Sequence, residues 1–544
     1  MDKPKYPLFF IFVKTLIPDS MRKIFLCLWS LFLILDVSFA QPAIQWQKCL
    51  GGTDEDNATS LQQTADGGYI VAGSTTSNDG DVTSNHGGKD YWLVKLDVSG
   101  NIQWQKCFGG TNNDEAQAVQ QTSDGGYVIA GFTNSNDGDV TGNHGSIDCW
   151  IVKLDGSGNI QWQKCFGGTG WDDAYSVQQT TDGGYIVVGS TSSNDGDVTG
   201  NHGGFDFWIV RLNNSGTIQW HKCLGGTLND GATSVQQTSD GGYIVEGYTG
   251  SNDGDVTGNH DTTGYSDYWL VKLDGSGIIQ WQKCLGGTDE DQSYSVQQTS
   301  DGGYIVAGYA GSNDGDVTGN HYAGIGDYWI VKLDGSGNIQ WQKCLGGTDW
   351  DVAYSVQQTI DGGYIVAGST LSNNGNVVGN HDTTGSYNDY WIVKLNSAGN
   401  LQWQKCLGGT GYEEAYYIRQ TADEGFIIAG YAEYTDGDVT GSHGNVDFWV
   451  VKLSSFVGIE EESNNSTYNI SPNPFTSSAV ISFSGLAYNA TFSLYNLLGE
   501  KVTEATGING ERFEFNRSNL PSGVYVFEVR EKDKSIARGK AVVY

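Results

Sequence analysis

A polar loop of the type Asn-Asp-Gly-Asp-Val-Thr-Gly-Asn-His recurs along this chain, and its carboxylates are the first candidates for chemistry. From Asp79 to Asn85, side-chain oxygens stand at every second residue, which is how calcium-binding loops present their ligands. The candidate calcium ligands are Asp79, Asp81, Asp137, Asp139, Asp195, Asp197, Asp253, Asp255, Asp314 and Asp316. No bidentate Glu completes the pattern, which favours the alternative that these residues build Asx turns within a long loop. The sixth copy has Asn374 and Asn376 instead of carboxylates, so a metal loop there should be weak.

Two further sets of polar residues recur once in each copy. One histidine closes each loop, and no His or Cys stands nearby at ligand spacing, which favours a structural role over a zinc site. These histidines are His86, His144, His202, His260, His321, His381 and His443. A carboxylate follows each Gly-Gly-Thr segment, and the set could ring a central axis: Asp56, Asp114, Asp172, Asp230, Asp291, Asp351 and Glu413. Glycan hydrolysis needs two carboxylates in different environments, and a near-symmetric ring gives no reason for their pKa values to diverge.

The copies also differ, and a site with a single purpose should lie where they differ. Copies four to six lengthen the polar loop and add a tyrosine, while the segment that links copies carries other aromatic residues. The candidate ligand-binding aromatics on this rim are Trp171, Trp350, Tyr412, Tyr265, Tyr322 and Tyr387. Exposed aromatic rings stack on sugars and also anchor protein partners. Glu246 stands where other copies have Ala or Val, and if buried it needs a partner or a raised pKa.

The elements that position these residues belong to one unit, written seven times. Each copy contains a Thr-Asp-Gly-Gly turn between two β-rich runs, then the polar loop, a run such as FDFWIVRL and a strand such as IQWHKCL. This order predicts four short strands in each copy and no helix. Large residues occupy both faces of the strands, so each small sheet needs neighbours on two sides.

The strand count predicts the architecture. The chain enters the repeats on a fourth-type strand, Ile44 to Leu50, and leaves them after a third-type strand that ends at Leu453. A ring in which the N-terminal strand completes the last sheet resolves this mismatch and leaves no open edges. We therefore expect an all-β chain, a seven-bladed β-propeller of four-stranded blades at 41–454. A linear solenoid is the alternative, although no distinct capping repeats are present. The repeated cysteines are expected to be buried, unpaired apolar residues.

The two ends differ from the repeats. Residues 1–40 end in MRKIFLCLWSLFLILDVSFA, a basic start followed by an apolar core and small residues, which predicts a signal peptide cleaved after Ala40 with Met21 as the true start. Residues 455–467 form an acidic linker, and 468–544 predict a small β-sandwich. The net charge of −34 and pI near 4.3 argue against nucleic-acid or anionic-membrane partners.

Two resemblances follow from these motifs. The segment DYWIVKLDGSGNIQWQK resembles blades of quinoprotein-type propellers, and GGYIVAG is similar to kelch blades; no quinone cofactor is implied, because no adjacent cysteine pair occurs. The C-terminal segment closely resembles the type A C-terminal sorting domain of the type IX secretion system of Bacteroidetes. The residues that match its landmarks are Pro472, Asn473, Pro474, Gly499, Pro521, Gly523 and Tyr525. The resemblance implies export, recognition by the type IX machinery, cleavage in the linker, and attachment to surface lipopolysaccharide or release.

These observations predict an extracellular or cell-surface propeller, most simply a monomer, that binds a glycan or a protein through the loop-rich rim. The alternatives are a secreted glycan-degrading hydrolase of the endoglucanase type and a structural surface protein. No cofactor is expected other than calcium in the loops, and the residues offer no catalytic constellation.

Overall fold

The computed structural model describes residues 41–455, except 262–263, 323 and 383, and residues 468–543, except 472, 474, 497–500, 518–519, 522 and 533. The chain divides into two compact units, Met1–Phe456 and Val457–Tyr544. The predicted signal peptide at 1–40 and all but the first residue of the predicted linker lie outside the described residues. Within the described ranges, no helix is long and apolar enough to cross a membrane.

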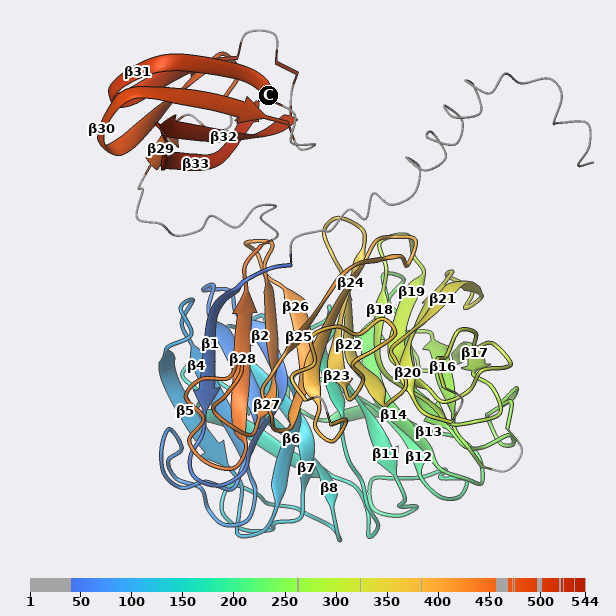
Figure 1. Cartoon of the computed structure of the whole chain (residues 1–544). Helices are drawn as coiled ribbons and strands as arrows, with labels where there is room; N and C mark the ends of the chain where they lie inside the picture. Colours follow the sequence, from blue (N-terminus) through green and yellow to red (C-terminus); the bar gives the residue numbers. More distant parts are fainter. Residues whose placement is uncertain are drawn as a thin grey trace, which may run out of the picture. The chain divides into compact units, whose positions relative to one another are not determined.

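Seven four-stranded antiparallel sheets make up the described part of the first unit (Figure 1), as the strand count predicts. Blade 1 contains β2 (Asp56–Gln63), β3 (Tyr69–Thr75), β4 (Asp90–Leu96) and β5 (Ile102–Phe108), and blade 2 contains β6 (Asp114–Gln121), β7 (Tyr127–Thr133), β8 (Asp148–Leu154) and β9 (Ile160–Phe166). Blade 3 contains β10 (Ser176–Gln179), β11 (Tyr185–Thr191), β12 (Asp206–Leu212) and β13 (Ile218–Leu224), and blade 4 contains β14 (Asp230–Gln237), β15 (Tyr243–Thr249), β16 (Asp267–Leu273) and β17 (Ile279–Leu285). Blade 5 contains β18 (Asp291–Gln298), β19 (Tyr304–Ala310), β20 (Asp327–Leu333) and β21 (Ile339–Leu345), and blade 6 contains β22 (Asp351–Gln358), β23 (Tyr364–Thr370), β24 (Asp389–Leu395) and β25 (Leu401–Leu407).

Blade 7 closes the ring with strands from both ends of the repeats. Its sheet order is β1 (Ile44–Leu50), β28 (Asp447–Leu453), β27 (Phe426–Ala432) and β26 (Glu413–Gln420). Cys49 pairs with Trp449 in this sheet, and the Trp449 indole N–H donates to Gln47 Oε1 at 2.7 Å. The first strand therefore removes the edge that an open stack would expose, and the solenoid alternative is wrong.

The blades are held together by the large residues of their third strands. The third-strand tryptophans of all seven blades are fully buried, and Tyr91 of blade 1 packs on Trp150 of blade 2 at a ring-centroid distance of 4.5 Å. Each apolar cluster in the propeller combines residues of adjacent blades, so a blade has no core of its own. The eight described cysteines are buried and unpaired, as expected.

Glycine is required in the turn between the third and fourth strands. Gly100 has φ of 78°, and a Cβ atom there would lie 2.8 Å from the ring of Trp46. The indole of the preceding outer strand therefore lies directly on the turn, and no side chain fits between them.

The second unit is an antiparallel β-domain. Its strands are β29 (Tyr468–Ser471), β30 (Ser478–Tyr495), β31 (Lys501–Asn516), β32 (Gly523–Glu531) and β33 (Lys534–Val543). The long strand β30 pairs with β29, β31 and β32 along different parts of its length. Phe475, Phe492 and Phe527 are among the residues that form its separate apolar core.

Candidate functional site

The innermost strand of each blade supplies the wall of a central channel. In blade 1 the pairing of β2 with β3 shifts register between Ala58 and Ser60, and the same shift occurs in every blade except blade 3. Such a bulge leaves one residue unpaired and re-aims its neighbours. In blade 3 the strand begins later, at Ser176, so that Asp173 and Tyr175 precede it.

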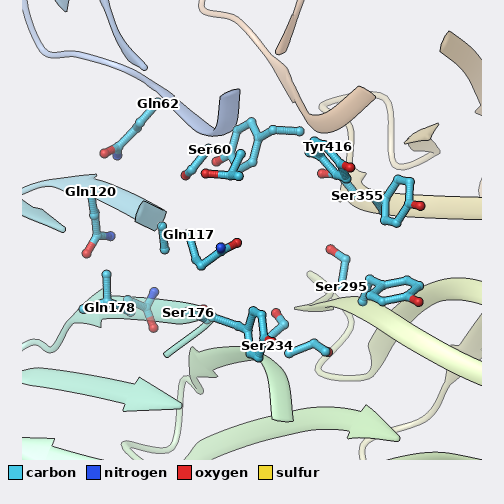
Figure 2. A pocket seen from close by; sticks show the side chains of 18 of the residues that line it. Ser60, Gln62, Gln117, Gln120, Ser176, Gln178, Ser234, Ser295, Ser355 and Tyr416 are labelled. Carbon is cyan, nitrogen blue, oxygen red and sulfur yellow. The ribbon is translucent and has the colours of Figure 1, made fainter. Parts of the chain in front are cut away.

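The channel widens at the rim that carries the blade-to-blade links. A cavity of about 730 Å³ lies at this mouth and is lined by seven tyrosines and three glutamates: Tyr175, Tyr248, Tyr294, Tyr354, Tyr412, Tyr416, Tyr431, Glu55, Glu115 and Glu433. A second cavity of about 400 Å³ continues along the channel (Figure 2). The two cavities share a ring with one residue from each blade: Thr59, Gln117, Tyr175, Thr233, Tyr294, Tyr354 and Tyr416.

An aromatic arc occupies one side of this mouth. Neighbouring rings have centroids 4.9 to 6.3 Å apart along the series Trp350, Tyr309, Tyr294, Tyr354, Tyr416 and Tyr431. These residues come from blades 5 to 7 and from the link between blades 5 and 6. Blades 1, 2 and 4 contribute the polar residues Thr59, Gln117 and Thr233 to the same ring, and blade 3 contributes Tyr175, so the continuous run of aromatic rings lies on the side of blades 5 to 7.

Hydrogen bonds fix the phenol groups of the arc. The Tyr416 hydroxyl donates to Glu414 Oε2 at 2.7 Å, and the Tyr294 hydroxyl donates to Gln292 Oε1 at 3.1 Å. Burial, with the Glu414 carboxylate nearby, raises the pKa of Tyr416 far above its usual range, so the hydroxyl stays protonated. The arc therefore presents oriented rings flanked by carboxylate and amide groups.

Glu246 lies in the wall beside this mouth and is fully buried. Its Oε1 accepts a hydrogen bond from Thr233 Oγ1 at 3.1 Å, whereas its Oε2 has no partner among the described residues. Burial raises the pKa of this carboxyl to about 8, against the hydrogen bond from Thr233, which lowers it. Glu246 thus has both features expected of a buried carboxyl, a hydrogen-bond partner and a raised pKa. With this pKa the side chain is mostly neutral at pH 7.

The polar loops and the blade links lie together on one rim, as predicted. Thr53 of the link donates its backbone N–H and its hydroxyl to the two carboxylate oxygens of Asp79, at 2.8 and 2.9 Å. The same pair of bonds is made by Asp137, Asp195, Asp253 and Asp314. In blade 6 the amide of Asn374 takes the place of the carboxylate: its Oδ1 accepts from Thr348 N at 2.9 Å, and its Nδ2 donates to Thr348 Oγ1 at 2.8 Å. An amide serves here as well as a carboxylate, which favours the turn-building interpretation of this position.

The second carboxylate of each loop lies near the adjacent blade. Asp139 Oδ2 accepts from Gly109 N at 3.4 Å, while Asp255 and Asp316 lie 3.8 and 3.7 Å from the histidine Nε2 of the preceding blade. The backbone N–H groups of Asp81 and Asp197 donate to carbonyls of the links. Within the described residues, no three His, Cys, Asp or Glu side chains come together as a metal site. Calcium binding by these loops stays a prediction.

The loop histidines and the link carboxylates are internal braces. Each histidine Nδ1 lies 2.5 to 2.9 Å from a buried aspartate that begins the third strand, as His86 does with Asp90. Asp56 is fully buried and accepts hydrogen bonds from Gly52 N, Thr75 Oγ1 and Ser77 Oγ. Asp56 and its equivalents stand at the start of the innermost strands, but none of them lines either of the two channel cavities, because these hydrogen bonds hold the carboxylate inside its own blade. Burial raises the pKa of Asp56 to about 6 despite these bonds.

The structure brings only some of the predicted rim aromatics to the mouth. Tyr412 lines the cavity, with Tyr387 packed edge-on against it at 4.8 Å. Trp350 packs on Tyr309 at the outer end of the arc. Trp171 packs on Phe205 at 6.3 Å outside the arc, and Tyr265 and Tyr322 are 50% and 58% exposed in the lengthened loops. The tyrosines of the inner strands were not predicted, although these positions vary between copies in the sequence.

In the C-terminal unit, the landmark residues serve the fold. Asn473 Oδ1 accepts from Val542 N at 2.7 Å, which ties the segment before the buried Phe475 to the last strand. The buried Tyr525 donates its hydroxyl to the carbonyl of Pro521 at 2.9 Å, and Gly523 begins β32. Pro472, Pro474 and Gly499 lie outside the described residues.

The first unit is a seven-bladed β-propeller with a cavity at its channel mouth. Residues 469–543 match the family model of the secretion system C-terminal sorting domain. This domain implies that the chain is a cargo of the type IX secretion system, is recognised by the type IX machinery and is exported to the cell surface.

The regulatory protein FlaEY of Caulobacter vibrioides is 25% identical over 343 residues, which are 56% of this chain and 35% of that protein. The match thus spans about a third of that relative. Among solved structures, a fungal alcohol oxidase of the AA5 family in complex with copper aligns with 92% of this chain and 99% of its own at 14% identity and a TM-score of 0.41. A puromycin hydrolase aligns with 82% of this chain and 62% of its own at 10% identity and a TM-score of 0.43. At these identities, neither the oxidase activity nor the hydrolase activity of these two proteins is assigned to this chain.

Proposed function

We propose that this type IX cargo binds a glycan in the tyrosine-lined mouth of its propeller channel. The observation that carries the proposal is that four tyrosines of the aromatic arc, from blades 5 to 7, line a concave cavity of about 730 Å³: Tyr294, Tyr354, Tyr416 and Tyr431. Cavities of this size are typical of small-ligand sites, and a flat protein interface would not need one.

The chemistry of the mouth suits a sugar. The faces of Tyr354 and Tyr416 offer apolar contact area with two rotatable side-chain bonds each, which limits the entropy lost on binding. Glu55, Glu115 and Glu433 lie around the same cavity and can accept hydrogen bonds from sugar hydroxyls. Because the ring residues differ from blade to blade, the mouth can bind one ligand in one orientation. The loop-borne Tyr412 and Tyr387 would extend the contact outward along the rim.

The test uses the secreted chain on a glycan array, followed by calorimetry with the glycans that bind. The variants Tyr354→Thr and Tyr416→Thr introduce the residue that blades 1 and 4 carry at this position, so the propeller accepts it. Each variant should weaken binding about 30-fold, the loss of one aromatic contact of about 2 kcal/mol. The matched control is Ile360→Ser, an 82% exposed residue in the hairpin turn of blade 6, where blades 2, 4 and 5 carry Ser. It should bind as the unaltered chain does.

Reducing-sugar release from the same glycans distinguishes binding from hydrolysis. Binding without release supports the proposal, whereas release would favour the glycoside hydrolase alternative. Absence of binding to any glycan, or equal binding by both tyrosine variants, would contradict the proposal and favour a protein ligand or a purely structural role.

A further inference from the structure

Adjacent blades are joined along the channel by side chains that cap backbone N–H groups. The innermost strand is an edge strand, so alternate N–H groups along it have no partner within their own sheet. In blade 2 these groups belong to Val119 and Gln121, and they donate to Ser60 Oγ and Gln62 Oε1 of blade 1 at 3.1 and 2.5 Å. The glutamine cap recurs at six of the seven junctions, through Gln62, Gln120, Gln178, Gln236, Gln297 and Gln357.

The junction from blade 7 to blade 1 lacks both caps. Tyr417 and Arg419 stand at the positions where blade 1 has Ser60 and Gln62. A guanidinium has five donors and no acceptor. The edge N–H of Gln63, which corresponds to that of Gln121, therefore has a donor side chain instead of an acceptor at its cap position, and the N–H of Leu61, which corresponds to that of Val119, has Tyr417 instead of a serine. No side-chain acceptor bonds either group among the described residues.

Arg419 itself has an unused donor. Its Nε donates to the Tyr417 hydroxyl at 2.8 Å, and its guanidinium carbon lies 5.0 Å from the centre of the Tyr417 ring. Its Nη1 is buried and has no hydrogen-bond partner within the described part of the chain. No carboxylate there pairs with Arg419, whereas Arg211, buried in the third strand of blade 3, forms an ion pair with Asp182 at 2.5 Å. A buried charged donor without an acceptor is costly.

We propose that the carboxylate group of a small ligand binds in the channel at this junction, held by Arg419 and the edge N–H groups of blade 1. Arg419 and Tyr417 line the 400 Å³ cavity with Gln62 and Gln63, so a ligand that enters the channel reaches them. One carboxylate oxygen of the ligand accepts a hydrogen bond from the backbone N–H of Gln63, as the glutamine oxygen does at the other six junctions. The carboxylate also accepts a hydrogen bond from the unused Nη1 of Arg419. A planar monoanion matches the guanidinium fork.

The surroundings favour a single negative charge. The other residues at this level of the channel are neutral glutamines, so Arg419 is the sole charged side chain among the residues that line the 400 Å³ cavity. Glutamates line the mouth on the approach, and the chain carries a net charge of −34, which disfavours a dianion such as hydrogen phosphate. The site lies in the 400 Å³ cavity next to the mouth, where Tyr354 and Tyr416 border both cavities, and its test needs no sugar.

The test follows trifluoroacetate by fluorine NMR while the secreted chain is titrated at constant ionic strength. We expect saturable line broadening that acetate reverses and that phosphate at equal concentration reverses less. Arg419→Gln introduces the residue of the other six blades and should weaken binding at least about 10-fold, as expected for the loss of a charged hydrogen-bond donor. Arg211→Lys introduces the lysine that the other six blades have at that position and should leave binding unchanged.

Thermal unfolding of both variants shows whether each one is folded. Equal binding by the Arg419→Gln variant, equal losses in both variants, or broadening that does not saturate would each overturn the proposal. Any of these outcomes would mean that water, and not a carboxylate, accepts the hydrogen bonds of Arg419 Nη1 and the edge N–H groups. A carboxylate site that survives Tyr354→Thr would show that it is independent of glycan binding.

Discussion

Replacement of Glu246 by alanine should stabilise the propeller, and the gain should grow with pH. Alanine occupies this position in five other blades, as at Ala72 and Ala307, so the fold accepts it. The pKa of the buried carboxyl is raised from 4.5 to about 8. The folded chain thus holds a proton that the unfolded chain releases, and folding stability falls as the pH rises from about 4.5 to about 8.

The size of the effect follows from the shift. A difference of about 3.5 pKa units at about 1.4 kcal/mol each corresponds to about 5 kcal/mol at pH values well above 8. Between pH 5 and pH 8 the expected change is about 3.5 kcal/mol. The loss of the hydrogen bond from Thr233 adds an offset that does not depend on pH.

The assay is urea unfolding at pH 5 and pH 8, followed by tryptophan fluorescence. The stability of the Glu246→Ala variant relative to the unaltered chain should rise by about 3.5 kcal/mol between the two pH values. Glu246→Gln is the matched control, because it keeps the size of the side chain without its charge and should show the same pH dependence as alanine. A relative stability that is constant with pH would show that Glu246 is not held neutral, and the argument from burial would be refuted.

Four further predictions concern other parts of the propeller. Arg419→Gln should raise the free energy of unfolding by about 1 kcal/mol in carboxylate-free buffer, because glutamine caps the N–H of Gln63; an unchanged or lower value in urea unfolding would contradict this. Burial raises the pKa of Cys49 to about 12 and that of Cys107 further, so a thiol reagent at pH 8 should modify the eight described cysteines only after unfolding; rapid native labelling would count against buried thiols. Deletion of residues 41–50 should abolish cooperative unfolding because blade 7 loses its fourth strand; a deletion variant that melts like the full chain would argue against ring closure by β1. If the loops bind calcium, a chelator should lower the melting temperature; no shift would remove that prediction.

The architecture could be predicted because each strand carries its own marker. Trp92 and its equivalents mark the third strands, and the repeats begin on a fourth-type strand, Ile44–Leu50, that completes blade 7. These markers are local and recur in every copy, so a strand that is hard to assign in one copy can be assigned by comparison with the others. The shortened β10 was not predicted, because Asp173 turns inward and accepts a hydrogen bond from Ser190 N instead of continuing the strand.

The site was harder to predict because it depends on partners distant in sequence. Asp56 looks like an axial carboxylate in the sequence, but Thr75 and Ser77 of the same blade hold its side chain away from the channel cavities. The bulge at Thr59 decides which residues of the inner strand face the channel, and no residue type in the sequence marks it. One signal was present: Thr59, Tyr354 and their equivalents vary between copies, although the position of Asn57 and Val352 varies as well.

The most direct test of the central claim is a crystal structure of the secreted chain with a glycan selected on the array. The account predicts a sugar ring in the channel mouth, in contact with Tyr354 or Tyr416 and within hydrogen-bond distance of a mouth glutamate. A glycan bound instead on the outer rim beside Trp171, or between the outer strands of two blades, would contradict it.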